Sequence, residues 1–115
     1  MRKLEYLAKL PREEASALLV SASDKLHNAR AILSDLLVIG PSVFTRFNRG
    51  RDGTLQYYRL LADTYQNITR SDVQARPRLQ ALFAELERTL TTLETACGLE
   101  AEQVRDSPLL RMTAR

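Results

Sequence analysis

Apolar residues recur at a spacing of three to four along most of the chain. Leucine and alanine dominate the apolar positions, and runs of β-branched residues are absent. This spacing places apolar side chains on one face of a helix. The pattern therefore predicts an all-α fold. No apolar stretch approaches the ~20 residues that a membrane-spanning helix needs, so we expect no membrane partner.

Proline and glycine divide this pattern into a bundle of about four to five helices. The expected helices span about residues 3–10, 12–38 and 54–67, and a last long helix opens within 71–78 and ends at Cys97. A short helical turn is expected over 42–47, and a loop over 48–53. Gly98 is expected to end the last helix. One domain over 1–98 would then be followed by a partly ordered tail, 99–115.

The helix expected over 12–38 has apolar residues on two sides. One continuous stripe consists of Ala15, Leu18, Leu19, Ala22, Leu26, Ala29, Leu33, Leu36 and Leu37. Asp24 lies roughly opposite this stripe, on a side that also has Ala17, Val20, Ala31 and Val38. A helix that is apolar on both sides usually packs against neighbours on both sides. The other expected helices are too few to cover it twice.

Charge and cysteine content exclude several classes of protein. The 17 basic residues, 14 of them arginine, interleave with 14 acidic residues and give a net charge of +3. We therefore expect no nucleic-acid partner, since nucleic-acid binding requires a one-signed stripe of charge. The lone Cys97 excludes an intramolecular disulfide and a cysteine zinc cage. Residues 1–6 contain no apolar run typical of a signal peptide, and we expect a soluble, cytoplasmic protein.

Asp24 and Asn28 are four residues apart and project from one face of the expected helix. A carboxylate is a hard oxygen donor for a divalent cation, and an amide one turn away can hydrogen-bond a bound ligand. The same spacing also occurs on ordinary solvated helix faces. His27, the only histidine, is expected to be a hydrogen-bonded structural residue rather than a ligand. Asp24 and His27 alone do not supply the three protein ligands of a catalytic metal.

The segment around these residues, Ser-Ala-Ser-Asp-Lys-Leu-His-Asn-Ala-Arg (21–30), resembles the last metal-ligand motif of HD-domain metal-dependent phosphohydrolases. The similarity is greatest to the RelA/SpoT-type branch, which removes the 3′-pyrophosphate of (p)ppGpp. Residues 46–50 and 53–59 resemble small bacterial HD proteins of this branch, which usually have tryptophan where this chain has Gln56. The resemblance covers roughly residues 2–95.

The resemblance implies a role for each matching residue. Asp24 matches the final aspartate of the metal set, which in the complete family binds a cation, typically Mn²⁺. Asn28 matches the asparagine that contacts the nucleotide. Many of these hydrolases have threonine where this chain has Ala31. The family's first histidine and its His-Asp pair lie upstream of the final aspartate, and no histidine precedes Asp24 here.

Two functions follow as expectations. The first is a fragment of a (p)ppGpp-hydrolase-like enzyme, acting on a nucleotide or another phosphate ester, whose metal site is incomplete. No complete catalytic set is present, we expect no tight metal binding by this chain alone, and activity would require the missing N-terminal half. The alternative is a non-catalytic interaction module that self-associates or binds a partner through its exposed apolar face.

The densest basic run has two interpretations. Arg46, Arg49, Arg51 and Arg59 surround a loop that contains glycine. Guanidinium groups suit phosphates, which favours a nucleotide-facing loop. The other interpretation is a solvated loop in which these arginines cap helix ends or pair with Asp52 and Asp63. Cys97 is expected at a helix C-terminus, where nothing lowers its pKa, so we expect an inert thiol.

Overall fold

The computed structural model describes residues 2–47 and 50–106, and all regular secondary structure in those ranges is helical. The predicted all-α fold is confirmed. The elements are α1 (Arg2–Lys9), the 3₁₀ helix η1 (Leu10–Arg12), α2 (Ala15–Ile39), the 3₁₀ helix η2 (Gly40–Arg46), α3 (Gly50–Gln66), α4 (Ser71–Gln74), α5 (Pro77–Ala96) and α6 (Ala101–Arg105). No helix within the described ranges is both long and apolar enough to cross a membrane.

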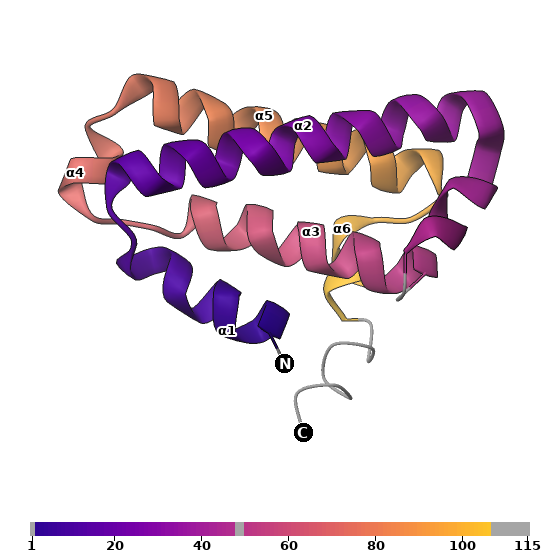
Figure 1. Ribbon diagram of the computed structural model, residues 1–115, viewed down its shortest axis with the longest axis horizontal. Coiled ribbons are helices and arrows are strands. Elements are labelled where there is room, and N and C mark those ends of the chain that lie inside the picture. Colours follow the sequence, from indigo (N-terminus) through magenta and orange to yellow (C-terminus); the bar gives the residue numbers. More distant parts are fainter. Residues whose placement is uncertain (1, 48–49, 107–115) are drawn as a thin grey trace.

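The helices form a flat slab in which α2 and α5 run side by side (Figure 1). The α3 helix packs against α5, and it also contacts α1, η2 and α6. The slab measures 40 × 34 × 22 Å, and its smallest dimension is about two helix diameters. A long helix in such a thin slab has one side turned to the core and another turned to solvent.

The core side of α2 is close to the predicted apolar stripe. Its buried residues are Ala15, Leu18, Ala22, Leu26, Ala29, Ile32 and Leu36. Ile32 is buried although it lies outside the predicted stripe. The prediction is wrong for Leu37, which is 73% exposed, because it faces Thr89 and Thr92 of α5 across an open pocket instead of a packed contact.

The opposite side of α2 is uncovered by the described residues. All four of its apolar members, Ala17, Val20, Ala31 and Val38, are exposed. Val20 is 71% exposed and Val38 is 81% exposed. Ile39, at the C-terminal end of α2, is also 54% exposed. The second apolar side therefore exists as predicted, and its packing against a further element stays a prediction.

Several predicted helix boundaries shift. The α2 helix begins at Ala15 instead of Arg12, because Pro11 lies in η1 and the chain is extended at Glu14. The α3 helix begins at Gly50, inside the segment predicted as a loop. Gly50 has a φ of +67°, a conformation that glycine adopts without strain, and it lets the chain turn directly into α3.

The end of α5 confirms the predicted role of Gly98. This glycine has a φ of +74°. Its N–H donates to the Thr95 carbonyl, and the Leu99 N–H donates to the Glu94 carbonyl, which is the Schellman pattern. The chain then forms α6, whose Val104 is buried, so the first part of the predicted tail packs on the helical body. The rest of that tail, 107–115, lies outside the described residues.

Candidate functional site

The predicted metal-ligand position, Asp24, lies near the middle of α2 and faces solvent. Its side chain is 60% exposed, and its Oδ2 lies 3.6 Å from Nζ of Lys25. Its negative charge also contributes to the raised pKa of Tyr58 on α3, so the two side chains lie near each other. Asp24 is thus presented on an open helix face, beside the edge of α3.

The predicted substrate contact, Asn28, lies one turn further along α2 and is half-buried. Its side chain lies near the Tyr58 hydroxyl, since Asn28 is one of the groups that act on the pKa of Tyr58. Burial raises the pKa of Tyr58, the Asn28 side chain lowers it, and the charge of Asp24 raises it. The two residues singled out in the sequence therefore act on the same tyrosine.

Asn28 and Tyr58 also line an open pocket of about 440 Å³. The pocket lies between α2, η2 and α3, and its lining residues are Asn28, Ala31, Ile32, Asp35, Arg46, Phe47 and Tyr58. Pockets that bind small molecules typically measure ~300–1,000 Å³. The volume falls within that range.

Arg46 and Asp35 line this pocket together as an ion pair. Nη2 of Arg46 donates to Oδ2 of Asp35 at 2.9 Å, and Nε of Arg46 donates to the Val43 carbonyl at 3.3 Å. The guanidinium also lies 5.8 Å from the ring centre of Phe47. These contacts fix the orientation of Arg46, while its side chain stays 52% exposed. A guanidinium held in this way can pair with a phosphate oxygen.

His27 does not occupy the place expected for it. It is exposed on the outer side of α2, and it forms no hydrogen bond or ion pair with any residue of 2–47 or 50–106. The expectation of a hydrogen-bonded structural histidine is therefore wrong. His27 belongs to the outer side of α2, whose residues are exposed among the described ranges.

The described residues do not bring together a complete set of metal ligands. Nowhere in those ranges do three His, Cys, Asp or Glu side chains lie close enough to share one ion. Asp24 therefore offers one hard oxygen donor, which fits the chemistry of a single position in a divalent-cation site. The remaining ligands would have to come from residues beyond those described.

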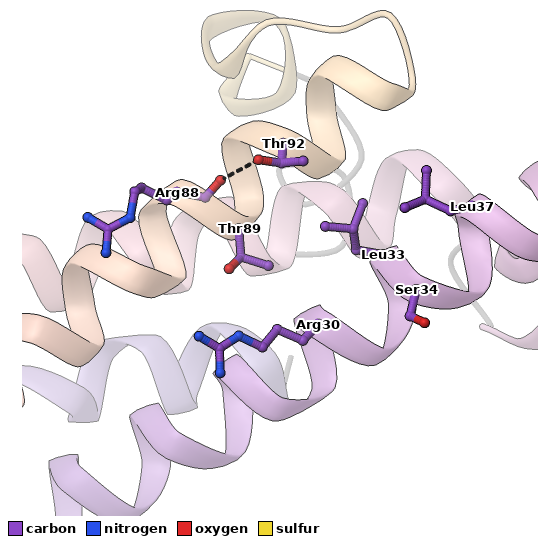
Figure 2. A pocket seen from close by; sticks show the side chains of 7 residues that line it. All are labelled: Arg30, Leu33, Ser34, Leu37, Arg88, Thr89 and Thr92. Carbon is purple, nitrogen blue, oxygen red and sulfur yellow. Dashed lines mark hydrogen bonds between the residues drawn. The ribbon is translucent and has the colours of Figure 1, made fainter.

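A second open pocket, of about 390 Å³, lies between α2 and α5 (Figure 2). Arg30 of α2 and Arg88 of α5 stand on its rim, and both bind Glu85. Leu33 and Leu37 form an apolar wall. Since one carboxylate already engages both guanidinium groups, this pocket offers less cationic character than its two arginines suggest.

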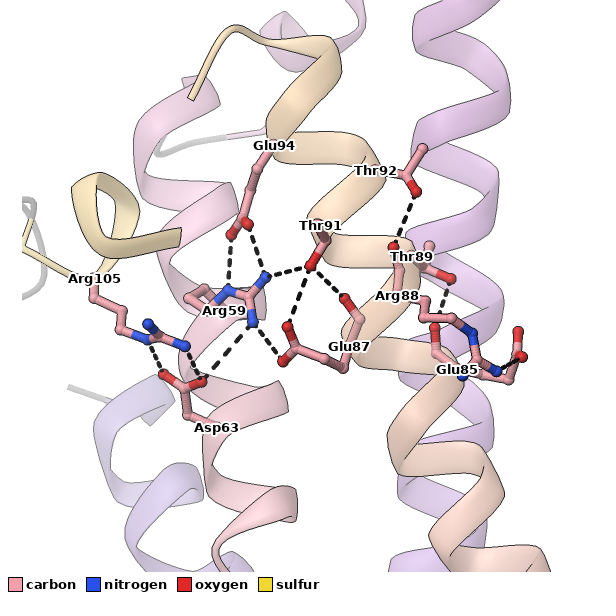
Figure 3. A network of polar contacts seen from close by, with 10 residues as sticks. All are labelled: Arg59, Asp63, Glu85, Glu87, Arg88, Thr89, Thr91, Thr92, Glu94 and Arg105. Carbon is pink, nitrogen blue, oxygen red and sulfur yellow. Dashed lines mark hydrogen bonds and ion pairs between the residues drawn. The ribbon is translucent and has the colours of Figure 1, made fainter. Parts of the chain in front are cut away.

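A buried ionic network is the main polar feature that sequence reasoning missed (Figure 3). The Arg59 side chain is fully buried on α3. Its Nε and Nη2 donate to the two carboxylate oxygens of Glu94 at 2.8 and 2.7 Å, and its Nη1 donates to Glu87 at 2.6 Å. These contacts join α3 to α5.

The network extends to α6 through Asp63. Its carboxylate lies 3.9 Å from Nη1 of Arg59 and accepts two hydrogen bonds from Arg105, at 2.7 and 2.9 Å. Burial lowers the pKa of Arg59, but the hydrogen bonds to Glu94 and Glu87 outweigh that effect and raise it. Every group of this network is engaged by a neighbour, so the network holds helices together and presents no open ligand position.

The interpretation of the basic run as a structural feature fits two of its four arginines, Arg51 and Arg59. Arg51 pairs with Asp52 at 2.8 Å, as predicted. Arg59 approaches Asp63 but binds mainly to α5, and it lies in the core, not in a loop. Arg46 lines the pocket described above, and Arg49 lies outside the described residues. Burial raises the pKa of Cys97, which agrees with an inert thiol.

Comparisons with known proteins add no relative. No protein-family model matches the chain, and neither the curated proteins nor the solved structures contain a significant match.

Proposed function

We propose that this chain provides one side of an HD-type metal-dependent phosphohydrolase site similar to that of guanosine polyphosphate 3′-pyrophosphohydrolases. In this proposal Asp24 is one ligand of a divalent cation such as Mn²⁺, and Asn28 contacts the nucleotide. Imidazole ligands come from a further segment or a partner. The chain alone is then inactive, because a single carboxylate holds a divalent ion only weakly against water.

The observation that supports this proposal best is the position of Asn28. It lines an open pocket with Arg46 and Tyr58 and lies one helical turn from the exposed Asp24. A phosphate ester bound in that pocket would meet a guanidinium on one side and an amide on the other. Its phosphate groups could then extend toward Asp24.

The residues of the chain would bind and orient the substrate. Arg46, held by Asp35, would pair with a phosphate oxygen, and Asn28 would donate a hydrogen bond from its amide. Tyr58 would fix the Asn28 amide from behind. A bound divalent cation polarises a phosphate and lowers the pKa of an attacking water. The described residues provide only one ligand for such a cation.

Nuclear magnetic resonance can test this proposal with guanosine 3′,5′-bispyrophosphate as the probe. Titration into ¹⁵N-labelled protein should shift the amide signals around Asn28, Arg46 and Tyr58. Asn28→Ala should weaken binding about 5–10-fold, as expected for a lost hydrogen bond worth ~1 kcal/mol. Ser34→Ala is the matched control, because Ser34 lies on the same helix and lines the other pocket. Shifts confined to the pocket of Arg30 and Arg88 would contradict the proposal.

Calorimetry tests the incomplete metal site separately. We expect no Mn²⁺ site of micromolar affinity in this chain. One such site, lost in Asp24→Asn, would mean that the chain completes its own metal site.

A second candidate function is a non-catalytic interaction module. The observation that favours it is the uncovered apolar side of α2, where Val20 and Val38 are 71% and 81% exposed. Large exposed apolar residues grouped on one helix face often mark a protein–protein contact. This function predicts association that depends on protein concentration, and a stable monomer at every concentration would contradict it.

A further inference from the structure

The open pocket between α2, η2 and α3 has an ion pair within a largely apolar lining. Its apolar and aromatic lining residues are Ala31, Ile32, Phe47 and Tyr58. Asp35 and Arg46 add opposite charges side by side, with 2.9 Å between Oδ2 of Asp35 and Nη2 of Arg46. A carboxylate repels a phosphate. The part of the pocket at Asp35 therefore suits a flat, uncharged group that has hydrogen-bonding atoms on its edge.

We infer that this ion pair recognises a guanine base and that Asp35 is the residue that selects it. The inference deepens the proposed function and rests on its nucleotide pocket. Guanine has an acceptor, O6, directly beside two donors, N1–H and N2–H, along one edge. Arg46 donates to O6, while the carboxylate of Asp35 accepts from N1–H and N2–H. The flat faces of the base lie against the apolar and aromatic lining.

Other bases match this pair of side chains less well. Adenine has a donor, the N6 amino group, where guanine has O6, and it has an acceptor at N1. In the same position it opposes a donor to Arg46 and an acceptor to Asp35. Hypoxanthine lacks the N2 amino group, and uracil places its O2 acceptor against the carboxylate. A site that hydrogen-bonds one pattern rejects the others, because its own polar groups are then left unpaired.

Both side chains keep atoms for a ligand while they hold each other. The bond from Arg46 is to Oδ2 of Asp35, so Oδ1 lies outside it, and the Asp35 side chain is 45% exposed. On Arg46, Nη2 donates to Asp35 and Nε donates to the Val43 carbonyl. A guanidinium has five N–H donors, so Arg46 can serve a base and a phosphate oxygen together. The ion pair fixes the carboxylate before a ligand arrives, which reduces the cost of binding.

Nuclear magnetic resonance titration of the ¹⁵N-labelled full chain tests the selection. The probes are the 5′-monophosphates of guanosine, inosine and adenosine, which differ only in the base. The guanosine nucleotide should bind about 10-fold more tightly than the adenosine nucleotide, and the inosine nucleotide should lie between them. The amide signals that shift should include those of Asp35 and Arg46.

Asp35→Asn should change the preferred base. The new amide oxygen accepts from N1–H, and the amide nitrogen donates to O2 of xanthine, whereas it opposes the N2 amino group of guanine. The variant should therefore bind xanthosine 5′-monophosphate more tightly than guanosine 5′-monophosphate, a gain that unfolding cannot produce. Asp52→Asn is the matched control, because it makes the same change in the exposed pair with Arg51, and it should keep the guanine preference.

The outcomes separate base selection from the proposed function. Equal affinities for the guanosine and adenosine nucleotides, or a guanine preference that survives Asp35→Asn, would overturn base selection alone. A guanine preference that depends on Asp35 but is unaffected by Asn28→Ala would support base selection and contradict the substrate contact at Asn28. No shift in this pocket with any of the nucleotides would overturn both.

Discussion

The buried pair between Arg59 and Glu94 yields the sharpest stability prediction. Glu94→Ala removes both acceptors of a bidentate contact, and it leaves the Arg59 guanidinium fully buried. Breaking a buried ion pair from one side costs ~3–5 kcal/mol, because the remaining charge is left without compensation. Glu87 still accepts from Nη1 at 2.6 Å, so we expect the lower end, about 3 kcal/mol.

That loss is large for a chain of this length. Domains of this size are stable by ~5–15 kcal/mol, and about 3 kcal/mol corresponds to a fall in Tm of roughly 10–15 °C. Urea denaturation followed by circular dichroism at 222 nm measures the free energy of unfolding directly. The midpoint should fall without a large change in the slope.

Two further variants test whether the unpaired buried charge causes the loss of stability. Glu85→Ala removes the acceptor of the exposed Arg30 and Arg88 pairs, and it should cost no more than ~1 kcal/mol. Replacing both buried partners, as in Arg59→Met/Glu94→Met, should cost much less than the sum of the two single changes, since no charge is then left unpaired. If Glu94→Ala costs as little as Glu85→Ala, the network does not hold α3 to α5 as described.

Three further changes test other parts of the fold. Leu26→Ala should lower the free energy of unfolding by ~2–5 kcal/mol because Leu26 is 5% exposed, whereas Leu37→Ala should be nearly neutral. Equal losses for the two variants in urea denaturation would contradict the assignment of the core face. Burial raises the pKa of Tyr57 to about 12, so the folded state resists its ionisation and loses stability as the pH rises from 10 to 12. Tyr57→Phe should reduce this loss of stability at alkaline pH. An unfolding profile that is the same in the variant and the wild type between pH 10 and 12 would contradict the role of Tyr57. In Gly98→Ala the new methyl group would have no atom within 4 Å, but alanine would have to adopt a φ of +74°. The variant should therefore lose ~1–2 kcal/mol of folding free energy, measured by thermal unfolding. A neutral result would show that the turn rearranges.

The helical class and the core face of α2 could be predicted because they follow from local spacing. The position of Leu18, Leu26 and Leu36 in one stripe fixes which side of α2 meets the core. The exposure of Leu37 could not be predicted from the spacing on α2, because it depends on α5, which has threonines opposite Leu37. The early start of α3 at Gly50 depends on a positive φ that the sequence permits but does not require.

The candidate site was predictable only in part. Spacing placed Asp24 and Asn28 on one helix face, but it did not show that Asn28 would meet Tyr58 and Arg46, which are distant in sequence. The buried network was missed because Arg59 was grouped with neighbouring loop arginines. Glu87, Thr91 and Glu94 lie at helical spacing on α5, and this polar row beside the leucine stripe was the available signal.

The most direct test of the proposed half-site is paramagnetic broadening by Mn²⁺ in the presence of guanosine 3′,5′-bispyrophosphate. Amide signals near Asp24 and Asn28 should broaden first, and Asp24→Asn should remove this broadening while Asp52→Asn leaves it unchanged. Broadening that persists in Asp24→Asn, or that centres on another part of the chain, would contradict the central claim that Asp24 marks a cation position beside a nucleotide pocket.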